Sequence, residues 1–367
     1  MKKICHITST RQNSIPRLLR ESGTAVNMDL KPIIVALGST FERDGIDFIG
    51  VAPPKSRLER MLKTSRILVN EGIKTDAEIY QLHDPELLPY AMKLKRMGKK
   101  VIFDSHEFYA RQIQVREYLP KPLRNIVSKA YKAYEGHICR KLDAVLAVCT
   151  INGKDYFEGR SKQTVFLENL PDITIFSDDE TEYKTREKNV IYIGALSDSR
   201  GITNLIKAAA LAEIKLVLCG PFDSDDYKKS LEAMPEYKWV DYRGVLSRKE
   251  IAEVLKTCGV GASTLRDVGQ YFEIDTLPTK VYEYMALGLP VLISDTGYAK
   301  KLLNKDKFGV STNPEDPTDM ARNIKELISN PIESENMGKV GKELVKTKFN
   351  WQEEEKKLIK LYNELLQ

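Results

Sequence analysis

A helix joined by one glycine to a buried strand, within residues 278–294, constrains the fold of this chain more than any other stretch. Pro278 and Thr279 suit a helix start, because proline lacks an N–H group and the first N–H groups of a helix have no partner within it. Gly288 ends the helix predicted over 280–287, and the apolar run 289–294 follows as a buried strand. We therefore expect an α/β unit here, with the polar loop 275–279 ahead of its helix.

The start of this predicted helix favours an anion, because its free N–H groups and its dipole attract negative charge, above all a phosphate. Lys280 adds a positive charge at the same end, and Glu283 places a carboxylate one turn further on. A carboxylate beside a phosphate is unfavourable unless it bonds another group, such as a sugar hydroxyl. The alternative interpretation is that Glu283 is a solvated acid of the first helical turn.

Two apolar runs in the first half of the chain, 77–82 and 99–103, end in polar residues that include histidines. In a doubly wound sheet, ligands bind outside the carboxyl ends of the strands, so these polar residues are expected at one site. They are His83, Asp84, His106 and Glu107. The alternative is that each histidine is a hydrogen-bonded structural residue. The loop after the first predicted strand, 3–8, carries Arg11, which could face either of two substrates.

The second half opens with a predicted strand over 189–193, then Gly194, a short loop and a helix from about residue 202. Gly194 allows a ligand to approach the backbone closely, and Arg200 puts a cation at the helix start. Gly220 follows the next predicted strand, 215–219, in the same way. Loops of this kind favour phosphate binding.

Length and composition favour two globular domains, since the chain has 367 residues, of which 42% are hydrophobic and 30% charged. The net charge of +5 is too mild to indicate a nucleic-acid-binding protein. The 5 cysteines are odd in number and include no C-x-x-C pair, so neither a zinc site nor a disulfide framework is predicted. Asp223 and Asp225 form an Asp-x-Asp pattern, which we interpret as an acidic loop and not as a metal site.

The run PTKVYEYMALGLPV, residues 278–291, with Asp275 ahead of it, resembles a motif of the retaining glycosyltransferases of family 4. The resemblance spans nearly the whole chain and is firmest from residue 189 onward. It implies the α/β GT-B fold, with two Rossmann-like domains facing a cleft and a C-terminal helix that crosses back to the first domain. The expected boundaries are 1–175 plus the helix 352–367 for an acceptor-binding domain, and 176–351 for a nucleotide-sugar-binding domain.

The resemblance also implies a role for each residue that matches the family pattern. The catalytic set is His106, Asp275, Arg200 and Lys280. The donor-binding set is Gly194, Arg200, Gly220, Gly244, Val245, Thr276, Leu277, Pro278, Thr279 and Glu283. The acceptor-binding set is Arg11, His83, Asp84 and Glu107. Neither a cofactor nor a metal ion is implied.

Two positions depart from the family pattern. Asp275 stands where the family usually has glutamate, and Ala195 stands where it usually has arginine. One of the two cations expected beside a diphosphate is therefore missing, and we expect Lys280 to compensate in part.

The function implied is retaining transfer of a hexose from a nucleotide-sugar to a glycan or lipid-linked acceptor, in bacterial cell-surface polysaccharide synthesis. UDP is the expected nucleotide, with GDP as the alternative. Two other functions stay open. One is a nucleotide-sugar 2-epimerase of the same architecture, and the other is a non-catalytic nucleotide-binding partner subunit, for which the departures at Ala195 and Asp275 speak.

Two predicted helical stretches, 56–71 and 108–141, are rich in basic residues. We interpret each as a solvated surface, with a membrane-surface patch as the alternative for 56–71 and contact with anionic headgroups or a lipid-linked acceptor as the alternative for 108–141. No window holds about 20 apolar residues, and the N-terminal apolar run is too short for a signal peptide. We expect a cytoplasmic protein without nucleic-acid partners, and leave open a peripheral contact with the inner face of the plasma membrane.

Overall fold

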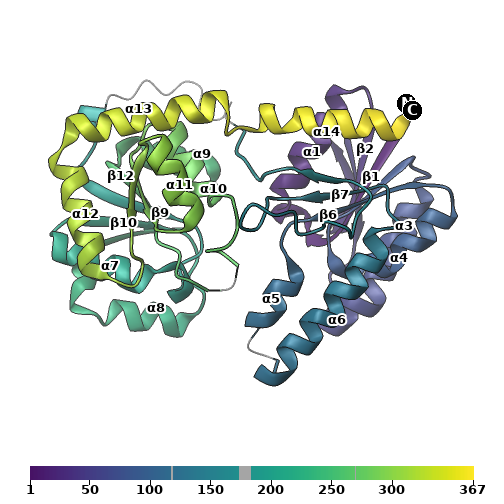
Figure 1. Cartoon of the computed structure of the whole chain (residues 1–367), viewed down its shortest axis with the longest axis horizontal. Helices are drawn as coiled ribbons and strands as arrows, with labels where there is room; N and C mark the ends of the chain where they lie inside the picture. Colours follow the sequence, from purple (N-terminus) through teal and green to yellow (C-terminus); the bar gives the residue numbers. More distant parts are fainter. Residues whose placement is uncertain (117–118, 173–182, 269) are drawn as a thin grey trace. The chain divides into compact units, whose positions relative to one another are not determined.

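The computed structural model describes residues 1–116, 119–172, 183–268 and 270–367, which form two compact units (Figure 1). Unit 1 comprises Met1–Asn169 and Trp351–Gln367, and unit 2 comprises Leu170–Asn350. The boundary expected between residues 175 and 176 lies outside the described residues. The chain returns to unit 1 at Trp351, next to the predicted position 352.

Unit 1 is built on an eight-stranded sheet in the order β3-β4-β2-β1-β5-β6-β7-β8. Every neighbouring pair is parallel except β3 and β4. The strand order runs outward in both directions from β1 and β5, and the carboxyl ends of such a central pair are where open α/β sheets bind ligands. The strands are β1 (Lys3–Arg11), β2 (Lys31–Leu37), β3 (Phe41–Arg43), β4 (Ile46–Val51), β5 (Ile79–Leu82), β6 (Lys100–Ser105), β7 (Ala144–Ala147) and β8 (Thr164–Phe166).

Helices cover both faces of this sheet. One face packs against α3 (Ser65–Lys74), α4 (Leu88–Arg96) and α6 (Lys121–Cys139), and the other against α1 (Pro16–Asn27) and α14 (Trp351–Leu366). Ile4 belongs to the core under α1 and α14, whereas Cys5 and Ile7 belong to the opposite core. Since successive side chains of a strand point to opposite faces, His6 lies on the α1 and α14 side.

Unit 2 is built on a six-stranded parallel sheet in the order β11-β10-β9-β12-β13-β14, with β9 and β12 as its central pair. One face packs against α9 (Arg248–Thr257), α10 (Thr279–Ala286) and α11 (Gly297–Lys305), and the other against α7 (Ile202–Ala212), α8 (Asp225–Glu232) and α12 (Pro317–Ser329). A further helix, α13 (Pro331–Thr347), contributes Met337 to one core and Val345 to the other. The strands are β9 (Asn189–Ile193), β10 (Lys215–Cys219), β11 (Val240–Gly244), β12 (Val260–Ser263), β13 (Val291–Ser294) and β14 (Gly309–Thr312).

The predicted α/β class, with two parallel-sheet units, is confirmed. The helix expected at 280–287 is α10, and Gly288 follows it with a φ of +70°, a left-handed conformation that ends helices. The strand expected next is β13. The C-terminal helix α14 packs on unit 1 through Leu358, Leu361 and Tyr362.

The two basic stretches are each divided. Residues 56–71 form α2 (Arg57–Glu59), a π-helical turn (Arg60–Thr64) and most of α3, and the described part of 108–141 forms α5 (Tyr109–Val115) and α6. Within the described residues, no helix combines the length and the apolar character that crossing a membrane requires.

Candidate active site

Two glycines at the carboxyl edge of the unit 2 sheet leave bare backbone facing a lysine. Gly194 follows β9 with a φ of +118°, and Gly220 follows β10 with a φ of +141°. A Cβ atom on Gly220 would lie 2.0 Å from the carbonyl oxygen of Gly194, so no side chain fits there. A Cβ atom on Gly194 would lie 3.3 Å from Nζ of Lys280. The space in front of these turns is therefore lined by backbone and by one ammonium group.

Lys280 and Arg200 are two cations at this edge that lie against aromatic rings. Nζ of Lys280 is 3.5 Å from the centre of the Tyr192 ring, and the guanidinium carbon of Arg200 is 5.1 Å from the centre of the Tyr271 ring. Among the residues that the structure describes, no carboxylate lies within 4.0 Å of either cation. Burial and the nearby Arg200 hold the pKa of Lys280 well below its usual value. An anion placed here would relieve that repulsion.

The loop before α10 and the first residue of that helix carry four of the predicted donor-binding residues. Asp275 and Thr276 are partly exposed, Leu277 is buried, and Pro278 precedes the first helical residue, Thr279. The N–H group of Leu277 donates to Oη of Tyr282 at 3.3 Å, which ties the loop to the helix that it precedes. The loop thus delivers Lys280 and the first N–H groups of α10 to the same edge as Gly194.

Glu283 is almost fully buried, with 5% of its surface exposed, and forms an ion pair with Arg248. Arg248 is the first residue of α9, whose start is fixed by the capping box of Ser247 and Glu250. The interpretation of Glu283 as a solvated surface acid is therefore wrong. Sequence reasoning missed Arg248; its signal was a basic residue in the first turn of a helix, where acids are favoured.

Gly244 and Val245 lie at the end of β11, beside the two glycine turns. The N–H group of Gly220 donates to the carbonyl oxygen of Gly244 at 2.7 Å, and Oη of Tyr242 donates to the carbonyl oxygen of Gly220 at 3.0 Å. Val245 is 71% exposed. Its apolar surface stands next to the bare backbone and is available to a flat ring. Unit 2 thus gathers glycine turns, two cations, a buried carboxylate and an apolar residue at one edge.

In unit 1, most of the predicted acceptor-binding residues have partners within the protein. Oδ2 of Asp84 accepts the N–H group of Ser9 at 2.6 Å and the hydroxyl of Thr8 at 2.8 Å, so this carboxylate fixes the end of β1. Glu107 accepts a hydrogen bond from Gln112. Arg11 is the exposed last residue of β1.

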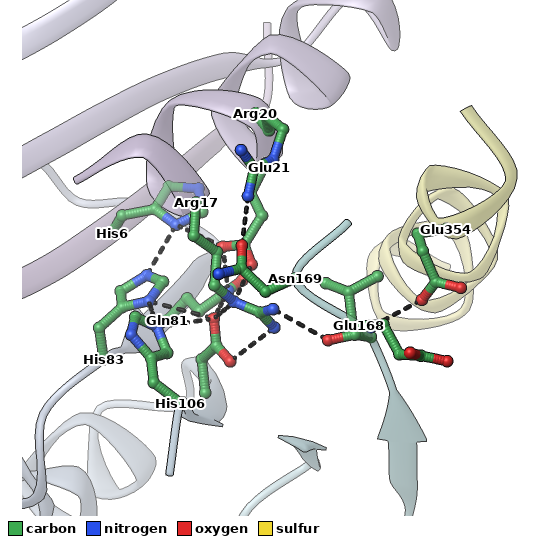
Figure 2. Close-up of polar contacts among 12 residues, drawn as sticks. His6, Arg17, Arg20, Glu21, Gln81, His83, His106, Glu168, Asn169 and Glu354 are labelled. Atoms are coloured by element: carbon green, nitrogen blue, oxygen red, sulfur yellow. Dashed lines mark hydrogen bonds and ion pairs between the residues drawn. The ribbon is translucent and has the colours of Figure 1, made fainter. Parts of the chain in front are cut away.

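His83 and His106 belong to a chain of three histidine rings that starts at His6 (Figure 2). Nδ1 of His6 lies 3.0 Å from Nε2 of His83, and Nδ1 of His83 lies 3.1 Å from Nε2 of His106. His6 and His83 are completely buried, whereas 32% of the His106 side chain is exposed. The chain therefore leads from the core under α1 to the carboxyl edge of the sheet. The structural alternative fits His83, which is the buried middle ring, and the site-facing interpretation fits His106, which is the partly exposed ring at the end of the chain.

Buried charges flank these rings on the face covered by α1 and α14. Arg17 bonds both carboxylate oxygens of Asp104, through Nε at 3.0 Å and Nη2 at 2.9 Å, and contacts Oε1 of Glu21 at 3.0 Å. Nε2 of Gln81 donates to Oε2 of Glu21 at 2.8 Å, and Oη of Tyr362 on α14 donates to Oε1 of Gln81 at 2.8 Å. Arg17, Glu21 and Gln81 were absent from the predicted site.

The pKa values of this cluster follow from its burial and pairing. Burial alone would raise the pKa of Asp104, but the adjacent Arg17 holds it well below its usual value. Burial, with the Asp104 charge nearby, raises the pKa of Glu21 well above its usual value. Burial also lowers the pKa of His6 and of His83, so both rings are neutral near pH 7.

Nδ1 of His83, Oδ2 of Asp104 and Nε2 of His106 lie 3.1 to 3.3 Å apart, a spacing that three metal ligands could also adopt. Asp104, however, already has both oxygens bound by Arg17. A second cation at Asp104 would be repelled by that guanidinium, so the geometry favours a hydrogen-bonded cluster.

Comparison with known proteins agrees with this arrangement. Residues 175–344 match the family described as glycosyl transferases group 1. An uncharacterized glycosyltransferase of Methanocaldococcus jannaschii is 25% identical over 182 residues, which cover 48% of this chain and 45% of that protein. The match thus spans less than half of the length of that relative.

Solved structures extend the likeness to the whole chain. A sucrose-phosphate synthase of Thermosynechococcus elongatus superimposes with a TM-score of 0.78 at 17% identity, covering 100% of this chain and 99% of the other. Anabaena HepE in complex with UDP and glucose superimposes with a TM-score of 0.70 at 15% identity, covering 99% and 100%. The protein therefore has the GT-B fold of nucleotide-sugar glycosyltransferases, as the sequence predicted.

Proposed function

We propose that this protein is a retaining glycosyltransferase of the family 4 type, which transfers a hexose from a UDP-sugar to a glycan or lipid-linked acceptor. The observation that carries the proposal is the pair of cations, Arg200 and Lys280, at the glycine turns of unit 2. Neither has a carboxylate within ion-pair distance among the described residues. A diphosphate supplies the missing negative charge.

The chemistry would rest on stabilising the leaving group. The bond between the anomeric carbon and the diphosphate oxygen breaks, and negative charge grows on the diphosphate. Arg200, Lys280 and the first N–H groups of α10 offset that charge. The acceptor oxygen bonds to the anomeric carbon on the face that the diphosphate leaves, and its proton passes to the departing phosphate. No side chain is needed as a nucleophile.

The remaining donor residues suit the nucleoside. Glu283, held by Arg248, would bond the ribose hydroxyls, and the exposed Val245 beside Gly244 would cover one face of the base. Anabaena HepE, which has the same fold, was solved with UDP and glucose, and this favours UDP over GDP here. The shorter Asp275 would take the place of the usual glutamate at the sugar.

A thermal-shift series with UDP, GDP and their sugars, without added metal, tests the donor site. We expect UDP to raise the melting temperature of the wild-type protein, and Lys280→Ala and Arg200→Ala each to weaken binding about 10- to 100-fold. Lys305→Ala is the matched control and should bind like the wild type. Lys305 is an exposed lysine and the last residue of α11. A wild-type protein that no nucleotide stabilises would refute the donor site.

Product analysis separates transfer from the alternatives. Incubation of UDP-sugars with and without a glycan acceptor should give UDP and glycoside only when the acceptor is present. Isomerised UDP-N-acetylglucosamine without acceptor would identify a 2-epimerase. Binding without turnover of any donor would identify a nucleotide-binding partner subunit.

A lipid-linked acceptor is supported by helix α6. Its residues Leu123, Ile126, Val127 and Tyr134 are exposed and repeat at helical spacing, and Lys121, Lys129 and Lys132 are exposed on the same helix. A basic helix with an exposed apolar stripe suits the surface of an anionic membrane, where an inner-leaflet acceptor would be found.

Vesicle sedimentation tests this contact. The protein should bind vesicles that contain phosphatidylglycerol, and Ile126→Ser should reduce binding about tenfold or more, since a buried apolar side chain is worth about 1.5–3 kcal/mol. Ile332→Ser, an exposed isoleucine of unit 2, is the control. Equal binding of both variants would exclude α6 as the contact.

A further inference from the structure

His106 belongs to the predicted catalytic set, whereas the two buried rings behind it have no role in the proposed reaction. His6 and His83 touch no solvent, and each lies within 3.0 to 3.1 Å of its neighbour in the chain. In a neutral imidazole one nitrogen donates and the other accepts. The position of the hydrogen on each ring therefore follows from the groups that each nitrogen faces.

The Asp104 carboxylate determines the hydrogen on His83. Both oxygens of Asp104 bond to the Arg17 guanidinium, which keeps the carboxylate ionised and hydrogen-bond accepting. Nδ1 of His83 lies 3.2 Å from Oδ2 of Asp104. A lone pair on Nδ1 would face the lone pairs of an anion, so Nδ1 of His83 carries the hydrogen. Its Nε2 is then an acceptor.

His6 completes this arrangement from the core side. Nδ1 of His6 lies 3.0 Å from the accepting Nε2 of His83, so it carries the hydrogen. Nε2 of His6 has no partner among the described residues. A buried lone pair without a donor is less costly than a buried N–H group without an acceptor. Both observations place the hydrogen of His6 on Nδ1.

His106 then accepts a hydrogen bond from the ring of His83, on its buried side. Its Nε2 lies 3.1 Å from the Nδ1–H group of His83 and 3.3 Å from Oδ2 of Asp104. That oxygen already accepts Nε of Arg17 at 3.0 Å and is 3.3 Å from Nε2 of Gln81. Together with the Nδ1–H group of His83 at 3.2 Å, these donors surround that oxygen, so Nε2 of His106 accepts from His83. The hydrogen of a neutral His106 is on Nδ1, the nitrogen that does not face the cluster.

We propose that His83, oriented by His6 and Asp104, is a positioning residue that holds His106 as the neutral Nδ1–H tautomer. This inference rests on the proposed function only for the role that it gives to His106, which is a hydrogen bond to the sugar. An uncharged N–H group bonds a sugar oxygen without placing a positive charge against the positive charge that develops on the sugar. The same His106 as an imidazolium would oppose that charge.

Several charged and titratable groups face the three rings. On the strands and their ends they are Asp104 and Asp84, on α1 they are Arg17 and Glu21, and on α14 there is Tyr362 through Gln81. Arg17 and Asp104 neutralise each other. The hydrogen positions therefore follow from this pairing, and not from an isolated ring.

Nitrogen-15 NMR of the full chain, labelled at its 4 histidines, reads the tautomers directly. At pH 8 we expect neutral Nδ1–H rings for His6, His83 and His106, with the exposed His137 as an internal reference. Assignment uses single-histidine variants. An Nε2–H or doubly protonated His106 in the wild type would overturn the proposal, as would a joint shift of His83 and His106 on adding Zn²⁺ alone.

Two variants of His83 separate positioning from packing. His83→Asn keeps an amide N–H group near the position of Nδ1, and should keep His106 in the Nδ1–H form. His83→Leu removes the donor, so Nε2 of His106 should take a hydrogen toward Asp104. In transfer assays kcat should fall about tenfold for His83→Leu, with the donor KM unchanged, and should be largely restored in His83→Asn.

The NMR result does not depend on catalysis, so the two proposals fail separately. A protein with the expected tautomers that transfers no sugar would leave the hydrogen-bond chain intact and refute the proposed function. If His106 keeps the Nδ1–H form in folded His83→Leu, its tautomer is set by other groups, and the proposal is refuted.

Discussion

The carboxyl edges of the two sheets differ in how their charges are paired. In unit 1, Arg17 and Asp104 bond each other in the core. In unit 2, Lys280 and Arg200 lie against aromatic rings, with no carboxylate of the described residues within 4.0 Å. A paired buried charge holds its neighbours in fixed orientations. Cations without a counterion instead gain favourable electrostatic energy when an anion binds. The first edge holds its side chains in place through paired charges, and the second carries the cations that the proposed diphosphate would meet.

Removing one arginine from each edge tests this comparison most strongly. Arg17→Met leaves the Asp104 carboxylate buried and unpaired, and we expect a loss of about 3–5 kcal/mol in the free energy of unfolding. Arg200→Met leaves no carboxylate without its partner, and we expect the free energy of unfolding to change by less than about 1 kcal/mol. Urea denaturation of both variants measures the difference. Equal destabilisation would mean that the two edges do not differ in this way.

The rigid part of the unit 2 edge is expected to be its backbone. Gly220 has a φ of +141° and faces the Gly194 carbonyl oxygen, so Gly220→Ala should destabilise the protein by about 1–3 kcal/mol or more. Gly244, with a φ of +73°, has no atom within 4 Å of a Cβ position. Gly244→Ala should therefore cost only the backbone strain of a left-handed alanine, about 1 kcal/mol. Thermal unfolding compares the two, and an equal cost would show that the contact with Gly194 is unimportant.

The buried histidines should make unit 1 sensitive to acid. The pKa of His6 is lowered in the folded state from 6.5, so below pH 6.5 the unfolded chain binds a proton that the folded chain does not. Stability is then lost as the pH falls from 6.5, by about 1.4 kcal/mol per pH unit for this group. His6→Asn should lose stability less steeply than the wild type by about that amount between pH 6 and pH 5.

Urea denaturation at several pH values measures these slopes. Glu21 has a raised pKa and contributes with the opposite sign above pH 4.5, but it is present in both proteins, so the difference isolates His6. Parallel slopes for the wild type and His6→Asn would show that His6 is protonated in the folded protein.

Much of the fold could be read from the sequence because short-range patterns encode it. Apolar runs marked β1, β5, β9 and β13, and Gly288 ended α10, since a glycine's freedom at positive φ is a local property. The residues at the carboxyl edge of the unit 2 sheet could also be predicted, because Gly194, Arg200 and Lys280 lie at strand and helix ends, and such ends meet at the edge where α/β sheets bind ligands.

Only part of the histidine cluster could be predicted from the sequence. His83 and His106 were found because they follow strands, whereas His6, Gln81 and Asp104 lie inside them, on the face covered by α1 and α14. Polar residues within apolar runs carry no sign of their partners. Arg248 was missed because its partner Glu283 lies on a different helix, although a basic residue in a first helical turn was a signal for it.

The sequence by itself determined where strands and helices follow one another along the chain, and it placed cations at the ends of these elements. The reason is that hydrophobic periodicity and helix capping act over a few residues. Only the tertiary structure decided which buried charged and polar groups pair. Arg17 meets Asp104, and Tyr362 meets Gln81, across large separations in the chain. Burial then fixes their protonation, because an ionised or polar group removed from water depends on the partners that the fold brings to it.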